Sequence, residues 1–401
     1  CSKQRYKYYR CRTVKNSAGV CNNTHSIRQI DLEDLILKEL HKMSETYFDE
    51  NEIKLQKKRD SQNRLSTLQE EKRQIENKIA KLQNDSVQLY KDKLSGIVSD
   101  EQFKKIQDLG YDVVRISESK VTNSSETDDA DILVCYNPFK TLDIEKMKNL
   151  KYIMLTSVGF DQLPKEKVLA RNIKVTNNRG GYSIPMAEWI VMCILEIYKR
   201  AKMFYNQQQE KIWHMDLVSI SELYGQRIGF LGTGTIAIEA AKRLQGFGVE
   251  IWGNNTNGRD VEYFDKCFSK DEIDEIFKNC DVVVSTMPCT KETEGMFDKN
   301  KFSLMKEGSS FINVGRGKNV KEDDLLLYLG KFKGVALDVF EQEPLPKDSL
   351  LWDAENVIVT PHNCWVSEKN PIRVEKLMYS NLKKYKEGKE LANIVNVERG
   401  Y

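Results

Sequence analysis

Short apolar runs alternate with helical patterns through the part of the chain that follows residue 107. The runs are Asp131–Tyr136, Tyr152–Thr156, Ile173–Asn177, Arg227–Leu231, Val249–Gly253, Val282–Thr286, Ser310–Val314, Gly334–Val339 and Val357–Thr360. Strands that alternate with helices indicate βαβ units and parallel sheets. A long helix, predicted over about Pro185–Tyr205, interrupts the series. We therefore expect an α/β protein with one sheet before this helix and a second after it.

The first 106 residues have a different pattern, without Trp or Pro. A helix is predicted over about Asp31–Tyr47, since its apolar residues recur at helical spacing. Further on, the apolar residues that share the a and d positions of one heptad frame are Leu65, Leu68, Ile75, Ile79, Leu82 and Leu89, interrupted by Lys72 and Ser86. This pattern predicts a helical hairpin arm or a short coiled coil. The alternative is a solvated helix that packs on its own domain.

Composition places few constraints on function. The formal net charge is +2, so there is no overall attraction to nucleic acid or membrane, although basic residues crowd the segment Lys3–Lys15. No apolar run approaches the roughly 18 residues of a membrane span. Nine cysteines, an odd number, are scattered through the chain and indicate free thiols in a reducing compartment. We expect a cytoplasmic protein with no membrane partner.

A glycine-rich motif follows the predicted strand Arg227–Leu231. The motif runs Gly232, Thr233, Gly234, Thr235, Ile236, Ala237 and leads into a predicted helix, Ile238–Gln245. The first glycine permits a tight turn, the second lets the backbone approach a pyrophosphate, and the small alanine allows close packing of helix and strand. The sequence therefore predicts a dinucleotide site with the anion at the N-terminus of the helix.

The strand Val249–Gly253 should end near the ribose of that dinucleotide. NAD sites place a carboxylate about 20 residues after the glycine motif, but here the segment 254–259 holds Asn255, Thr256 and Arg259 and no acid. Arg259 is suited to pair with a 2′-phosphate, which favours NADP over NAD. In the alternative interpretation Arg259 is merely exposed, and Asn255 binds the ribose hydroxyl of NAD.

Chemically active residues follow the ends of later strands. Arg316 comes after Ser310–Val314, Glu343 comes before Pro344 downstream of Gly334–Val339, and His362 follows Pro361 after Val357–Thr360. The carboxyl ends of parallel strands line one crevice, so we expect these side chains to converge beside the nicotinamide. Arginine can hold a carboxylate, and histidine can exchange a proton with a carbonyl oxygen. A neighbouring carboxylate orients the histidine and stabilises its protonated form.

Residues 108–401 resemble the D-isomer-specific 2-hydroxyacid dehydrogenase family. Besides the motifs above, the matching segments are Ser157–Asp161, Asn178–Gly181, Met186–Glu188 and Met287–Thr290 with Thr293. The resemblance implies a Rossmann-type doubly wound parallel sheet, a flavodoxin-like substrate domain, and a homodimer. It implies that Arg316 binds substrate, that His362 is the acid/base assisted by Glu343, and that backbone amides near Val158 and Gly159 hold the substrate carboxylate. The further cofactor-binding residues it implies are Met287, Pro288, Thr293, Val314 and Asp338.

Some neighbouring residues compete for these roles. Glu341 lies close to Glu343, but Glu343 directly precedes Pro344, as in the family. His214 is interpreted as a surface or core histidine. Trp365 follows the active histidine where many relatives carry small residues, so it is expected to wall the pocket, whereas Trp352 is expected in the core.

The first 106 residues resemble the C-terminal part of large serine recombinases. Tyr8–Cys11 and Cys21–Ile27 are similar to the second half of a zinc ribbon, and the charged stretch up to Lys105 is similar to the coiled-coil arm. A closed zinc site needs four ligands, whereas Cys11 and Cys21 are only weak candidates, with Cys1 as a third. Unligated cysteines are therefore the favoured interpretation. Nucleic-acid binding through Lys3–Arg12 would be weak and sensitive to salt, and we regard it as improbable.

The junction replaces the strand and helix with which relatives begin. Leu94–Val98 is apolar enough for a strand, and the capping spacing of 99–102 predicts a helix that ends at Gly110. The expected division is a partial zinc-ribbon-like segment (1–30), a helical coiled-coil arm (31–106), a substrate domain (107–203), a dinucleotide domain (204–366) and a C-terminal return to the substrate domain (367–401). The expected function is NAD(P)-dependent hydride transfer. The alternative is an inactive or weakly DNA-binding relic of a recombinase fusion.

Overall fold

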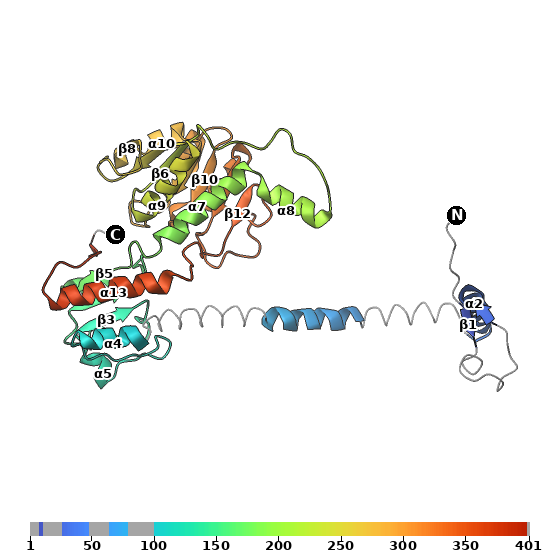
Figure 1. Ribbon diagram of the computed structural model, residues 1–401, viewed down its shortest axis with the longest axis horizontal. Helices are drawn as coiled ribbons and strands as arrows, with labels where there is room; N and C mark the ends of the chain where they lie inside the picture. The colour runs from blue at the N-terminus through green and yellow to red at the C-terminus, as the bar shows by residue number, and fades with distance from the viewer. Residues whose placement is uncertain (1–7, 11–25, 48–63, 79–99, 399–401) are drawn as a thin grey trace. The chain divides into compact units, whose positions relative to one another are not determined.

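The computed structural model describes residues 8–10, 26–47, 64–78 and 100–398, and it divides into the units Cys1–Gln88 and Leu89–Tyr401 (Figure 1). In the first unit, β1 (Tyr8–Arg10) pairs antiparallel with β2 (Ser26–Arg28), and α2 (Gln29–Tyr47) follows. Residues 64–78 are also helical. The helix predicted over Asp31–Tyr47 is thus confirmed, whereas Cys11, Cys21 and the predicted strand Leu94–Val98 lie outside the described residues.

The apolar residues of these front helices face solvent within their own unit. Leu35, Leu40 and Met43 of α2 are more than half exposed, and so are Leu65, Leu68 and Ile75 of the second helix. Within the described parts of the chain, no helix is long and apolar enough to cross a bilayer, and no group of three potential metal ligands is present.

A small parallel sheet forms the first layer of the second unit. Its strands are β3 (Ile132–Cys135), β4 (Tyr152–Leu155) and β5 (Lys174–Thr176), in the order β3-β4-β5. One face of β4 packs on α4 (Asp100–Asp108) and α13 (Asn370–Lys386) through Ile106, Met378 and Leu382. The predicted helix before Gly110 and the predicted C-terminal return to this sheet are both present. The opposite face packs on loops and on α6 (Lys165–Ala170), and α5 (Ser125–Asp128) lies before β3.

The larger sheet has seven parallel strands in the order β12-β11-β10-β9-β6-β7-β8. They are β6 (Arg227–Leu231), β7 (Glu250–Asn254), β8 (Lys266–Phe268), β9 (Val282–Ser285), β10 (Ser310–Asn313), β11 (Gly334–Leu337) and β12 (Val357–Val359). The order reverses at β6, which is the topology of a doubly wound Rossmann sheet. Every strand expected from the apolar runs is present. The sequence pattern missed β8, because its three residues alternate too briefly to be recognised.

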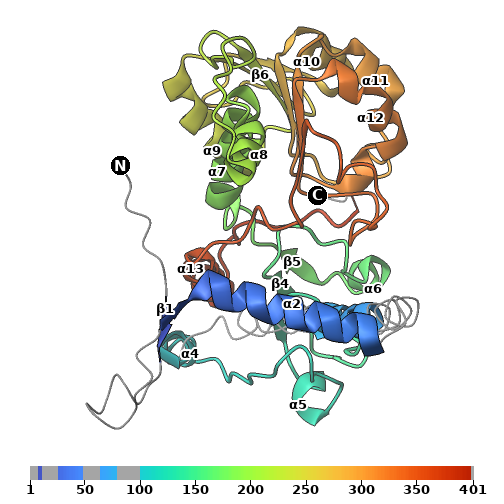
Figure 2. The same cartoon turned by 90° about the vertical axis from the view of Figure 1, so that its right-hand side faces the viewer.

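Helices cover both faces of this sheet. One face carries α9 (Thr235–Leu244) and α7 (Ser183–Tyr198), and the other carries α10 (Asp274–Asn279), α11 (Lys299–Leu304) and α12 (Glu322–Tyr328). In Figure 2 the sheet lies between the helices α7 and α9 on one side and α10, α11 and α12 on the other. Short 3-10 turns occupy Gln245–Phe247, Lys270–Glu272, Gly317–Asn319 and Leu329–Lys331.

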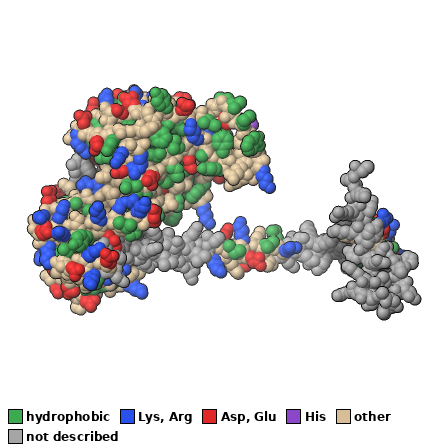
Figure 3. Space-filling model, viewed as in Figure 1, with side chains coloured by type: hydrophobic (Ala, Val, Ile, Leu, Met, Phe, Trp, Pro, Cys, Tyr) green, Lys and Arg blue, Asp and Glu red, His purple; other side chains and the backbone are tan. Residues whose placement is uncertain are grey.

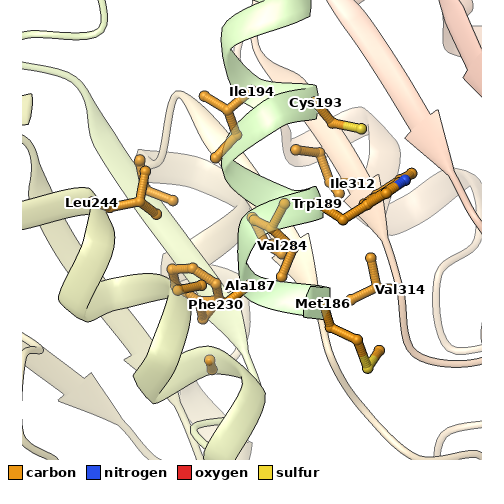
Figure 4. Close-up of a cluster of buried hydrophobic side chains, with 14 of the residues drawn as sticks. Met186, Ala187, Trp189, Cys193, Ile194, Phe230, Leu244, Val284, Ile312 and Val314 are labelled. Carbon is orange, nitrogen blue, oxygen red and sulfur yellow. The ribbon is translucent and has the colours of Figure 1, made fainter. Parts of the chain in front are cut away.

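The long helix predicted over Pro185–Tyr205 is broken in two. α7 ends at Tyr198, Arg200 adopts a left-handed φ of 53°, and α8 (Ala201–Glu210) follows. Figure 4 shows Trp189 and Ile194 of α7 packed with Phe230 and Ile312 of the large sheet. Because of this packing α7 belongs to the large-sheet layer, and the expected boundary at 203/204 lies too late in the chain.

Candidate active site

The glycine-rich turn joins β6 to α9. Gly232 has φ 92°, a conformation that L-residues rarely adopt, and Ala237 is fully buried between helix and sheet. α9 begins at Thr235 with Gly234 as N-cap and no side-chain cap, and a Cβ on Gly234 would meet nothing within 4 Å. The open space in front of uncapped helix amides suits an anion.

One buried polar atom of this turn has no partner. Thr233 is 4% exposed, and its Oγ1 makes no hydrogen bond within the described chain. Buried polar atoms are nearly always paired, so this orphan hydroxyl is the kind of atom that a bound ligand satisfies. The turn therefore fits the pyrophosphate of a dinucleotide, as its sequence predicts.

The loop after β7 is held together by Asn255. This side chain is buried, its Oδ1 accepts hydrogen bonds from the amides of Asn257 (3.3 Å) and Arg259 (3.1 Å), and its Nδ2 donates to the carbonyl of Arg259 (2.8 Å). These bonds commit the amide to the loop itself. Thr256 and Arg259 lie on the exposed side of the loop.

His362 and Glu343 form the closest pair of the predicted trio. His362 Nδ1 lies 2.7 Å from Glu343 Oε2, and Glu343 Oε1 accepts from the amide of Phe340 at 3.1 Å. Burial alone would raise the pKa of Glu343, but the hydrogen bond and charge of His362, with help from the Phe340 amide and Arg316, lower it below its ordinary value. The carboxylate is therefore ionised at neutral pH, and the other ring nitrogen of His362 is left for a substrate.

Glu341 does not compete for His362. Glu341 and Glu322 form two reciprocal hydrogen bonds instead. Glu322 N donates to Glu341 Oε2 at 3.0 Å, and Glu341 N donates to Glu322 Oε1 at 2.6 Å. These two hydrogen bonds fix the turn before Glu343 to the start of α12, and the carboxylate that contacts His362 is that of Glu343.

Asp338 supports the loop that carries His362. The loop needs support because His362 has φ 51°. Asp338 is fully buried, its carbonyl accepts from His362 N at 2.8 Å, and its carboxylate accepts from Thr360 Oγ1 (2.6 Å), Asn363 N (3.1 Å) and Cys364 N (3.1 Å). In this structure Asp338 thus holds the loop, whereas the family resemblance assigned it to the cofactor.

Arg316 meets the other domain. Its Nε lies 3.2 Å from Asp161 Oδ2, and its Nη1 donates to the carbonyl of Gly315 at 2.8 Å. Its Nη2 lies against Gly159, where any side chain would overlap it. Arg316, Val158 and Gly159 are therefore brought together, as the sequence analysis expected. Sequence reasoning assigned no role to Asp161, although it quoted this residue within a motif.

The predicted cofactor loop 287–293 is internally braced. Thr293 Oγ1 donates to the carbonyl of Pro288 at 2.8 Å, and Asn319 Nδ2 donates to the carbonyls of Met287 (3.3 Å) and Pro288 (3.2 Å). Val314 is almost fully buried behind this loop. No sequence pattern pointed to Asn319, because its hydrogen bonds reach a segment some 30 residues earlier in the chain.

The two tryptophans behave differently. The ring of Trp365 packs at a tilt of 51° against Tyr182, with a centroid distance of 5.0 Å, and its Nε1 donates to the carbonyl of His362 at 2.9 Å. Trp352 was expected in the core but is 48% exposed, with Nε1 bound to the carbonyl of Pro346. His214 lies in an outer groove of about 670 Å³ that α8 and the segment after it line, away from the trio.

Comparisons with known proteins agree with this geometry. Residues 191–364 match the model of the D-isomer specific 2-hydroxyacid dehydrogenase NAD-binding domain. The chain is 34% identical over 280 residues to a glyoxylate reductase of Thermofilum pendens, covering 67% of this chain and 82% of that protein. It is 30% identical over 303 residues to a D-3-phosphoglycerate dehydrogenase of Methanocaldococcus jannaschii, covering 74% and 58%.

Solved structures give the same result. A probable 2-hydroxyacid dehydrogenase from Rhizobium etli, in complex with NADP, aligns with TM-score 0.62 and 26% identity over 70% of this chain and 88% of that one. A D-isomer specific 2-hydroxyacid dehydrogenase from Xanthobacter autotrophicus, in complex with NADPH, aligns with TM-score 0.62 and 26% identity over 75% and 95%.

Proposed function

This chain belongs to the D-isomer specific 2-hydroxyacid dehydrogenase family, and we propose that it interconverts a small 2-keto acid and the corresponding D-2-hydroxy acid. The observation that carries this proposal is the 2.7 Å contact between His362 and Glu343 at the sheet end that also bears the glycine-rich turn and Arg316. A nicotinamide cofactor held at that turn supplies or accepts the hydride. The residues described below do the rest.

The chain's own residues bind the substrate and move its proton. Arg316 and the amides of Val158 and Gly159 hold the substrate carboxylate, which places the keto carbon at the cleft. His362 gives a proton to the keto oxygen while hydride adds to the carbon, so that a hydroxyl forms; in the reverse direction it removes that proton. Glu343 fixes the ring of His362 and stabilises its charge once it is protonated.

Glyoxylate and hydroxypyruvate are the first substrates to test. The relatives named for these activities come from Thermofilum pendens and Thermotoga maritima. We expect oxidation of NADPH or NADH with at least one 2-keto acid of a panel, and a large loss of turnover in His362→Ala with cofactor affinity retained. Failure of the wild-type protein on the whole panel with both cofactors would refute the proposal and favour the alternative of an inactive relic.

For the cofactor we propose a preference for NADP(H). The segment 254–259 contains no carboxylate to repel a 2′-phosphate, Arg259 is exposed, and Asn255 is committed to the loop. Relatives that align in structure are described in complex with NADP or NADPH. The ratio of the Michaelis constants for NADPH and NADH tests the preference, and Arg259→Ala should weaken NADPH binding alone. A strong NADH preference of the wild type would overturn it.

We further propose that the protein is a homodimer that pairs through the segment after α8. Trp213, Leu217 and Val218 there are 96%, 84% and 92% exposed, a concentration of apolar surface that soluble monomers rarely carry (Figure 3). Light scattering of the wild type should give twice the chain mass, and Trp213→Glu with Val218→Glu should give the monomer.

For the location, we propose a reducing, cytoplasmic compartment, which the buried free thiols such as Cys193 and Cys364 favour.

For the domains, we propose that residues 100–182 and 367–398 form the substrate domain and 183–366 the dinucleotide domain.

For the front unit, we propose descent from the C-terminal part of a large serine recombinase. The antiparallel pair β1–β2 brackets Cys11 and Cys21, as in a ribbon. Zinc content after expression in zinc-supplemented medium tests whether this segment holds a metal. We expect less than one zinc per chain, because a closed zinc site needs four ligands and Cys11 and Cys21 are only two.

A further inference from the structure

The guanidinium of Arg316 is fixed by two of its three nitrogens. Nε binds Asp161 Oδ2 at 3.2 Å across the gap between the domains, and Nη1 binds the carbonyl of Gly315 at 2.8 Å. Nη2 has no hydrogen-bond acceptor within residues 100–398, and it lies against Gly159. Two of the three guanidinium nitrogens, Nε and Nη1, are therefore used for bonds within the protein. The third, Nη2, points at the segment expected to bind the substrate carboxylate.

That segment is arranged to present its amides. The carbonyl of Ser157 accepts from the amide of Asn178 at 2.8 Å, and the carbonyl of Val158 accepts from Asn177 Nδ2 at 2.7 Å. Within the described chain, the N–H groups of Val158 and Gly159 donate to no other atom. These N–H groups belong to the same two peptide groups as the bound carbonyls, so the two hydrogen bonds hold them in place for an anion.

We propose that Asp161 is a positioning residue for substrate binding. Its carboxylate holds Arg316 by Nε, so that Nη2 stays beside the amides of Val158 and Gly159 and the three donors together bind one carboxylate of a 2-keto acid. This inference rests on the proposed function, and it adds a residue of the substrate domain that sets the position of a side chain from the dinucleotide domain.

Folding stability does not explain this pair. The side chains are 32% and 64% exposed, and exposed ion pairs contribute little to stability. The alternative role for this contact is competition. Asp161 would then compete with the substrate for Arg316, and removal of the Asp161 carboxylate would tighten anion binding. The two roles predict opposite signs for the same substitution, which makes them separable.

The experiment compares Asp161→Ala and Asp161→Asn with the control Glu166→Ala. Glu166 is an exposed carboxylate on α6 for which the described residues show no hydrogen bond, so its removal changes the net charge equally. We expect Asp161→Ala to raise the Michaelis constant for the 2-keto acid, and the dissociation constant of the unreactive analogue oxamate, by about tenfold, the effect of losing one charge-assisted contact. Asp161→Asn keeps an acceptor for Nε and should show a smaller rise. kcat, cofactor affinity and the control should change less than about threefold.

A second substitution ties the effect to Arg316. Lysine has no Nε–H edge, so in an Arg316→Lys background Asp161→Ala should change oxamate affinity by less than twofold. Unchanged or tighter oxamate binding in Asp161→Ala, or an equal effect in both backgrounds, would overturn the positioning role. Oxamate binding is measured without turnover, so a wild type that binds oxamate but reduces no 2-keto acid would refute the proposed function and leave this test valid. A wild type that does not bind oxamate would overturn both.

Discussion

Replacing Glu343 with Gln tests the proton-transfer role most directly. The substitution keeps the shape of the side chain, and its amide can still contact His362 Nδ1, but the negative charge 2.7 Å from the imidazole is lost. During reduction His362 must carry a proton before it gives it to the keto oxygen. Without the carboxylate, the protonated ring is less stable and is also less firmly oriented.

The magnitude follows from the contact. A hydrogen bond to a charged group contributes about 1.5–3 kcal/mol, and the two side chains are 43% and 36% exposed, so solvent screens part of the interaction. We expect a loss near the lower end of that range. At about 1.4 kcal/mol per factor of ten, kcat for reduction should fall about tenfold to thirtyfold at neutral pH.

The pH dependence gives a second readout. The pKa of Glu343 is held below its ordinary value by its contacts with His362. The stabilisation by this group is therefore fully present above its ordinary pKa of about 4.3 and is lost only as pH falls through the lowered value. In the wild type Glu343 thus stays ionised over pH 5–8, so the loss of rate in Glu343→Gln should be present throughout that range.

Steady-state rates from pH 5 to 9 with saturating cofactor measure both effects. Glu355→Gln is a matched control, because Glu355 is exposed and the described residues show no hydrogen bond to it. Equal kcat of Glu343→Gln and the wild type across this pH range would refute the role assigned to the His362–Glu343 pair.

Three further substitutions probe the parts around this pair. Asp338→Asn alters a fully buried carboxylate that accepts hydrogen bonds from Thr360, Asn363 and Cys364. It should lower the free energy of unfolding by about 1–3 kcal/mol, measured by thermal unfolding, and it should also lower kcat. An unchanged kcat would contradict the supporting role of Asp338 beneath the loop of His362. Gly159→Ala should raise KM for the keto acid more than about tenfold at unchanged cofactor affinity, because its methyl group overlaps Arg316; an unchanged KM would exclude that geometry. Gly234→Val should leave the melting temperature nearly unchanged, because a Cβ at this position meets open space. It should weaken NADPH binding by more than about tenfold in a fluorescence titration. An unchanged affinity would place the pyrophosphate elsewhere.

The large sheet was predictable because its signals are local. Strands such as Val282–Ser285 and Ser310–Asn313 are buried on both faces, so their central residues are consecutive apolar residues in the sequence. The glycine turn is equally local, since strand, turn and helix follow one another within about twenty residues. The placement of the proposed trio was expected for a related reason: in a parallel sheet, residues just after the strand ends share one edge.

Contacts between distant segments could not be predicted in this way. The Arg316–Asp161 pair joins residues 155 positions apart, and the sequence holds no pattern that links them. The position of α7 was also undetermined, because a helix that is apolar on most sides shows no single face from which its partner sheet can be inferred. Trp352 was misplaced for the opposite reason: its size suggested the core, but its indole N–H finds a carbonyl at the surface.

The distribution of the site over two domains has a mechanistic consequence. His362, Glu343 and Arg316 all come from the large-sheet domain, whereas the amides of Val158 and Gly159 come from the small one. Described contacts that connect the two near the site include Arg316–Asp161 and the tilted ring contact of Trp365 with Tyr182. Beside this junction, within the large-sheet domain, Ser183 Oγ donates to Thr235 Oγ1 at 2.9 Å. Ser183 and Thr235 begin α7 and α9, so the last contact ties the start of the connecting helix to the glycine turn. A dinucleotide bound at that turn would lie beside the segment where the domains join. We therefore expect ordered binding, with cofactor before keto acid, and a random order in initial-rate kinetics would contradict this expectation.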